Sequence, residues 1–121
     1  MSIYTDMIAH IEANGIGVRE LEASPGNPCC LFGVRNTVTN LAPNESLYHT
    51  NDIPELVNVV KKYIPKQTVD FFTLGTTKND SFSDYRWVYI YNDCIIKGDK
   101  DHAIRLLEDA EKLRIKNEIN L

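Results

Sequence analysis

Cysteine is scarce in this sequence and follows no spacing that a disulfide framework or a zinc site would need. There are three cysteines, and two of them, Cys29 and Cys30, are adjacent. An odd count with a vicinal pair excludes the disulfide framework of a small secreted protein. The three histidines are scattered along the chain and no Cys-x-x-Cys spacing occurs, so we expect no metal site. We likewise expect no cofactor.

Long hydrophobic runs and surplus positive charge are missing as well. No apolar stretch approaches the ~20 residues of a membrane span, and the amino terminus has no basic segment followed by a hydrophobic one. We therefore expect a cytoplasmic protein without membrane contact. Thirteen Lys and Arg stand against seventeen Asp and Glu, a net charge of −4. Because binding many phosphates needs a surplus of cations, DNA and RNA are disfavoured as partners, whereas a small anionic ligand is not.

The familiar catalytic motifs are absent too. There is no GxSxG elbow, no HExxH helix and no GxGxxG turn. Residues 75–78 have only a superficial likeness to a phosphate loop. Lys78 and nearby backbone amides could still meet an anion there, although a connection between strands explains them more simply. We find no catalytic set and expect a protein that is not an enzyme.

The composition that remains is typical of one globular domain spanning residues 1–121. It is 43% hydrophobic and 25% charged, with no internal repeat or linker. Apolar periodicity and end signals predict three helices. They run from a Ser2 cap to Asn14, from an Asp52 cap to the residue before Pro65, and from about Asp99 to Asn120.

Segments rich in β-branched and aromatic residues lie between these helices and favour strands. We predict strands over residues 16–22, 29–41, 47–49, 68–74, 85–91 and 94–96, with turn residues 24–28 joining the first two as a hairpin. The strands mostly follow one another without a helical crossover. The predicted fold is therefore α+β, with an antiparallel sheet core packed by helices.

Aromatic residues are concentrated near the predicted strand 85–91, where period-two alternation would place four of them on one face. Such a face is most simply explained by packing under a helix. Phe82 lies outside the alternation in a polar segment, where its ring could anchor the loop or stack on a nucleobase. Asn92 follows the strand, where its amide could form the turn, read a base edge or ribose, or do both.

Two arginines of the predicted last helix are candidates for contact with an anion. Arg114 projects near the centre of an apolar stripe, so it has to reach outward, pair with a carboxylate, or bind an anion such as phosphate. Arg105 lies on the opposite polar side, four residues before Asp109, where a solvated surface pair is the simpler explanation. A second, thin apolar line consists of Ile104, Ile115 and Ile119. We therefore expect a homodimer or a larger homo-oligomer.

The segment Ser81–Asn92, followed by Cys94–Ile96 and the charged terminal helix Asp101–Asn120, resembles the anti-Thoeris sponge proteins of phages. The resemblance covers most of the chain in size and in the order of elements. It implies a sheet core with a long C-terminal helix that embraces a partner protomer. It also implies that the protein sequesters a cyclic ADP-ribose isomer without degrading it, which would inhibit Thoeris defence in the host cell cytoplasm.

Carried onto this sequence, the resemblance implies that Phe82 stacks on the adenine, with Asn92 beside it. Basic residues of the embracing helices would meet the pyrophosphate, and Arg114 and Arg105 are the positions available. Lys78 is the next candidate. Holding a signal at about nanomolar affinity needs about −12 kcal/mol, which stacking, arginine–phosphate contacts and exclusion of water can supply together.

Two other functions are consistent with the same residues. One is a phosphodiesterase-like enzyme that cleaves a nucleotide signal, with Asp84 or His102 as the general base. The other is a phage accessory factor that presents the aromatic segment to a host protein. Intact ligand recovered from the complex would indicate sequestration, cleaved ligand would indicate the enzyme, and absence of binding would indicate the accessory factor.

Overall fold

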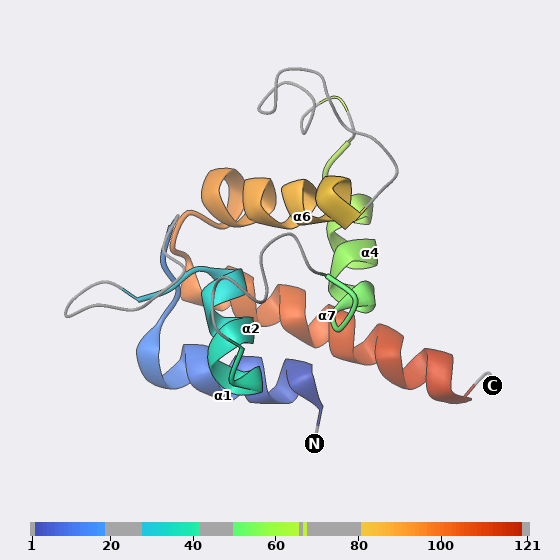
Figure 1. Ribbon diagram of the computed structural model, residues 1–121, viewed down its shortest axis with the longest axis horizontal. Coiled ribbons are helices and arrows are strands. Elements are labelled where there is room, and N and C mark those ends of the chain that lie inside the picture. Colours follow the sequence, from blue (N-terminus) through green and yellow to red (C-terminus); the bar gives the residue numbers. More distant parts are fainter. Residues whose placement is uncertain (1, 19–27, 42–49, 66, 68–80, 120–121) are drawn as a thin grey trace.

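The computed structural model describes residues 2–18, 28–41, 50–65, 67 and 81–119, with only the backbone described for 81–83. These residues form five α-helices and one π-helix (Figure 1). The elements are α1 (Ile3–Asn14), α2 (Leu31–Thr39), α4 (Pro54–Tyr63), α6 (Ser81–Ile90), the π-helix η1 (Tyr91–Ile96) and α7 (Lys100–Ile119).

The predicted α+β fold is wrong, because the described residues contain helices and no strand. The predicted strand 29–41 forms α2, and the predicted strands 85–91 and 94–96 lie in α6 and η1. The predicted strands 47–49 and 68–74, and most of 16–22, lie outside the described residues. The sheet core implied by the family resemblance is therefore not found in the part of the chain that is described.

The aromatic segment is helical because helical spacing gives its rings good packing partners. Tyr85 and Tyr89, one turn apart on α6, have ring centroids 5.3 Å apart. Tyr85 also stacks on Phe32 of α2, with centroids 4.5 Å apart, and Val88 is completely buried. The strand preference of aromatic residues reflects side-chain packing rather than the backbone. Contacts with α2 and α4 therefore outweigh the period-two pattern.

The β-branched residues of α2 are accommodated by hydrogen bonds within the helix. The hydroxyl of Thr37 donates to the carbonyl of Gly33 at 2.9 Å, and that of Thr39 donates to the carbonyl of Arg35 at 2.7 Å. Each threonine thus finds an acceptor one turn back along its own helix. The composition that favoured a strand is compatible with a helix once the apolar side of α2 is buried.

The three predicted helices are confirmed as α1, α4 and α7. The residues that start and end them lie next to the helices in the sequence, so the sequence alone could predict them. Ser2 caps α1 in a capping box with Thr5, and α1 ends at Gly15, which has a positive φ of 83°. Pro54 is the first residue of α4, one position later than the predicted Asp52 cap implies, and α4 ends before Pro65. The third helix, α7, runs from Lys100 to Ile119.

Helix α7 organises the fold, because it packs against α1, α4 and η1 (Figure 1). Its buried side chains are Ala103, Leu106, Leu107 and Ala110. The C-terminal part of α7 extends beyond the N-terminal end of α1 (Figure 1). Among the described residues, no helix combines the length and the apolarity needed to cross a membrane.

Gly17 allows two backbone segments to approach closely, and we expect its replacement to destabilise the fold. The Gly17 amide donates to the carbonyl of Cys29 at 2.8 Å, and a Cβ on Gly17 would lie 1.8 Å from the carbonyl oxygen of Pro28. Because the clash is with backbone, Gly17→Ala should lower the free energy of unfolding by about 1 to 3 kcal/mol. Urea denaturation measures this loss. The control Val18→Ala, at an exposed neighbour, should change it by less than about 0.5 kcal/mol. Equal stability of both variants would contradict this account.

Candidate functional site

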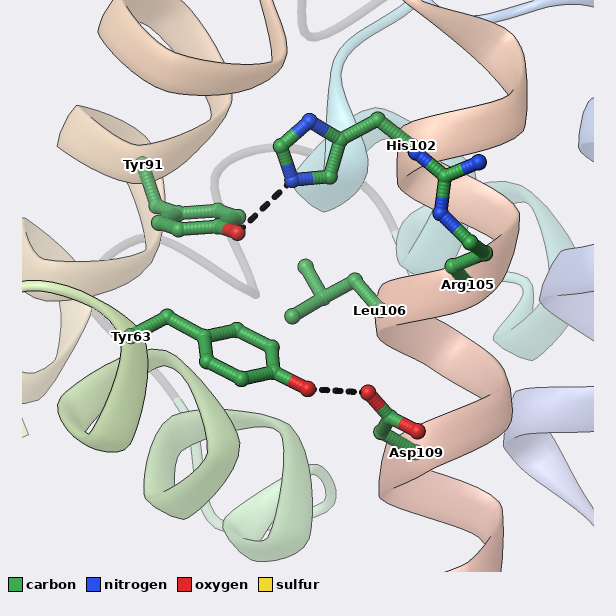
Figure 2. A pocket seen from close by; sticks show the side chains of 6 residues that line it. All are labelled: Tyr63, Tyr91, His102, Arg105, Leu106 and Asp109. Carbon is green, nitrogen blue, oxygen red and sulfur yellow. Dashed lines mark hydrogen bonds between the residues drawn. The ribbon is translucent and has the colours of Figure 1, made fainter.

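An open pocket of about 470 Å³ lies where α4, η1 and α7 meet. Figure 2 shows the side chains that line it: Tyr63 from α4, Tyr91 from η1, and His102, Arg105, Leu106 and Asp109 from α7. We call it the Tyr63–Tyr91 pocket. Its volume is in the range of small-molecule sites.

Local features of each helix bring these side chains together. Tyr63 is the last residue of α4 and is 50% exposed. Tyr91 is the first residue of the π-helix that continues α6. Short π-helical segments often occur at functional sites. On α7, His102, Arg105 and Asp109 recur at intervals of three and four residues, so they lie on one face.

Tyr91 and His102 form a hydrogen-bonded pair at one side of the pocket. The Tyr91 hydroxyl and His102 Nε2 are 2.8 Å apart, and the two rings meet edge to face with centroids 5.5 Å apart (Figure 2). Burial raises the pKa of Tyr91, the negative charge of Asp109 raises it further, and the positive charge of Arg105 opposes this. Tyr91 is therefore a neutral phenol at physiological pH, and a phenol hydroxyl can either donate or accept the hydrogen bond with His102 Nε2.

Tyr63 and Asp109 form a second pair across the pocket. The Tyr63 hydroxyl donates to Asp109 Oδ2 (Figure 2). This hydrogen bond is the main cause that raises the pKa of Tyr63 to about 12, with smaller contributions from burial and from the Asp109 charge. The Tyr63 and Tyr91 rings are 30° from parallel with centroids 6.2 Å apart. The pocket therefore presents two fixed aromatic rings, one of them half exposed.

Arg105 is the cation of the pocket. Its side chain is exposed, and its guanidinium forms no ion pair with any described residue. The predicted surface pair between Arg105 and Asp109 is not formed, and the Asp109 carboxylate accepts from Tyr63. Of the five predicted site residues, Arg105 is the one that the described structure places in this pocket.

The amide of Asn92 is engaged within the protein. Its Oδ1 accepts from the amide of Leu31 at 3.1 Å, and its Nδ2 donates to the carbonyl of Gly17 at 3.0 Å and to the Asp93 carboxylate at 2.9 Å. The side chain is 1% exposed. These contacts give Asn92 a structural role, close in sequence to Tyr91 but directed towards α2.

Arg114 meets carboxylates, one of the three outcomes considered for it. Its Nε donates to Glu111, and its Nη1 donates to Glu118 at 2.7 Å. The Glu111 carboxylate also accepts from the Ser2 hydroxyl, which joins α7 to the start of α1. Contact with Arg114, and to a lesser degree with Ser2, lowers the pKa of Glu111.

The other two predicted ligand residues are not placed. Lys78 lies outside the described residues, and nothing is described of the Phe82 side chain, although its backbone belongs to α6. The predicted roles of both residues stay predictions.

The two candidate general bases lie in different surroundings. Asp84 pairs with Lys61 at 2.8 Å, and His102 bonds to Tyr91.

Burial raises the pKa of the Cys29 and Cys30 thiols, which disfavours the nucleophilic thiolate. No group of three potential metal ligands is found among the described residues.

Sequence reasoning missed Tyr63 as a site residue. Tyr63 falls in the predicted helix that ends before Pro65, at helical spacing from Leu56, Val59 and Val60, which are buried. The available signal was its position at the helix end, two residues before Pro65, where one side of the ring is left uncovered. The spacing of His102, Arg105 and Asp109 was a second signal for one common face.

Comparison with protein families, with curated proteins and with solved structures finds no match for this chain.

Proposed function

We propose that the Tyr63–Tyr91 pocket binds a small signalling nucleotide of the cyclic ADP-ribose type and holds it without degrading it. The observation that carries this proposal is the exposed Arg105 guanidinium, which has no ion-pair partner in the described part of the chain and lines the same pocket as the half-exposed ring of Tyr63. In the cell, the proposed role of the protein is to inhibit Thoeris defence by sequestering its signal.

The pocket offers complementary groups for the parts of a nucleotide. An aromatic ring can stack on a base, and a guanidinium can bind phosphate through two parallel hydrogen bonds. The Asp109 carboxylate is an acceptor for ribose hydroxyls or for the amino group of a base. The described residues form helices where the resembled family has a sheet. The pocket therefore supports an anionic ligand with an aromatic base, and the choice of the cyclic ADP-ribose type is taken from the resemblance.

Titratable side chains of the pocket form hydrogen bonds with one another. His102 and Tyr91 bond to each other, and Tyr63 bonds to Asp109, so these groups stabilise the shape of the pocket. Tight sequestration also requires that water be excluded from the ligand. Since the pocket is open, we propose that a second copy of the chain covers it in a homodimer or larger homo-oligomer.

Titration calorimetry with cyclic ADP-ribose tests the proposal through Tyr63 and Arg105. Tyr63→Ala should weaken binding by about 1 to 3 kcal/mol through lost stacking. Tyr63→Phe keeps the ring and should stay within about threefold of the wild-type affinity. Arg105→Ala should weaken binding by about 1.5 to 3 kcal/mol through the lost contact with phosphate. Both side chains are substantially exposed, so the melting temperature without ligand should change little.

The fate of the ligand separates the alternatives. Intact nucleotide released from the heat-denatured complex would support sequestration. Linearised or hydrolysed nucleotide would indicate the phosphodiesterase-like enzyme instead. Absence of binding heat would contradict nucleotide binding and favour the accessory factor that contacts a host protein.

A further inference from the structure

A second pocket, of about 270 Å³, adjoins the first along α4 and α7. Both pockets are lined by Tyr63 and Asp109, so they lie next to each other on either side of the hydrogen bond between these two side chains. We call the two pockets together the groove. Three lysines line the second pocket: Lys62 from α4, and Lys112 and Lys116 from α7. We call it the lysine pocket.

The groove side chains of α7 lie in a row. Arg105, Asp109, Lys112 and Lys116 are separated by four, three and four residues. At 100° per residue all four lie within about 60° of arc, and at 1.5 Å per residue they extend over about 16 Å. The row therefore runs from the cation of the Tyr63–Tyr91 pocket through the lysine pocket.

Positive charge is concentrated in this groove although the whole chain carries −4. Arg105 and the three lysines are exposed, and none of them forms an ion pair within the described residues. Three other cations of the described residues do pair with carboxylates: Lys61, Arg35 and Arg114. The groove holds one carboxylate, Asp109, which already accepts from Tyr63. The groove is thus suited to an anion.

We propose that the lysine pocket binds a phosphate chain, so that the ligand of the groove is a nucleotide with two or more phosphates in succession. The nucleoside lies at the Tyr63–Tyr91 pocket, Arg105 binds the phosphate next to it, and the lysines bind the phosphates further along α7. The nucleoside part of this inference rests on the function proposed above. The lysine pocket itself requires only an anion with several charges.

Stabilisation of helix ends accounts for some of these lysines but not for the row. Lys62 lies in the last turn of α4 and Lys116 in the last turn of α7, where cations interact favourably with the helix dipole. Lys112 and Arg105 lie further inside α7. A dipole role alone would make lysine variants less stable without changing their affinity for phosphates.

Titration of AMP, ADP, ATP and inorganic tripolyphosphate in magnesium-free buffer tests the inference. For the wild type, affinity should rise about tenfold or more from AMP to ATP, because each added phosphate gains charge-assisted contacts. In the double variant Lys112→Gln/Lys116→Gln this rise should disappear, while AMP affinity stays unchanged. The control Lys97→Gln removes an exposed lysine outside the groove and should keep the rise.

The outcomes distinguish this inference from the proposed function. Equal affinities for AMP, ADP and ATP, or an unchanged rise in the double variant, would overturn the lysine pocket and leave nucleotide binding intact. If tripolyphosphate binds through the lysines and no nucleotide binds more tightly than it does, the lysine pocket is supported and the nucleoside part of this inference is wrong. If no probe binds, the lysine pocket is wrong, and the titration with cyclic ADP-ribose decides the proposed function separately.

Discussion

Replacing Arg35 by alanine is expected to lower the free energy of unfolding by about 3 to 5 kcal/mol, because it leaves a cavity in place of a fully buried side chain and removes the hydrogen bonds of its guanidinium. The Arg35 side chain is fully buried, and its Nη1 lies 2.8 Å from the Asp52 carboxylate, which is 28% exposed. Its Nε donates to Asn36 Oδ1 at 2.8 Å, and its guanidinium lies 5.3 Å from the Phe32 ring centroid. The substitution leaves a carboxylate and a buried amide oxygen without this donor and opens a cavity between α2 and the start of α4.

Urea denaturation followed by circular dichroism measures this loss. Arg105→Ala, the matched removal of an exposed arginine, should change the free energy of unfolding by no more than about 0.5 kcal/mol. Arg35→Met/Asp52→Ala removes both charges and keeps apolar volume at Arg35, so it should cost less than Arg35→Ala. A loss below about 1 kcal/mol for Arg35→Ala would show that the guanidinium is not important for the core.

Asn92→Ala is expected to lower the free energy of unfolding by about 3 kcal/mol, because it leaves two buried backbone groups without their partners. These groups are the amide of Leu31, at the start of α2, and the carbonyl of Gly17. Asn92 thus joins η1 to two segments far away in the sequence. If Asn92 instead read a ligand, as the sequence also allowed, Asn92→Ala would lose affinity at unchanged stability. Denaturation and titration calorimetry on the same sample decide between these roles.

Asn92→Asp is the matched variant, since it has nearly the same shape. One carboxylate oxygen of the variant still accepts from the Leu31 amide. The other oxygen replaces Nδ2, so the hydrogen bond to the Gly17 carbonyl is lost and two carboxylates, those of residues 92 and 93, lie side by side. Burial and this second carboxylate raise the pKa of the introduced carboxyl in the folded state. Its protonated form is therefore favoured by folding, and the stability deficit relative to wild type should shrink from about pH 7 to about pH 4. A deficit that is independent of pH would contradict this hydrogen-bond account.

The sequence predicted the candidate site only in part. Arg105 was singled out, but the predicted surface pair with Asp109 is not formed, and Asp109 bonds to Tyr63, a residue of another helix. Arg114 was singled out as a charge on an apolar stripe, and it forms ion pairs with Glu111 and Glu118 of the same helix. Arg35, the most deeply buried cation described, gave no signal, because its partner Asp52 lies seventeen residues away in the sequence.

By itself the sequence determined the three helices whose first and last residues are set by capping residues, glycine or proline next to them in the chain. The Ser2 cap with Gly15, Pro54 with Pro65, and the long helix-forming segment of α7 act within one or two turns, so they need no partner from elsewhere. Only the tertiary structure decided that residues 31–39 and 81–96 are helical, because aromatic and β-branched side chains pack well in either conformation and the neighbouring helices choose between them. The same holds for the groove, since α4 and α7 bring Tyr63 and Lys62 beside Asp109 and Lys112 through contacts between residues far apart in the chain.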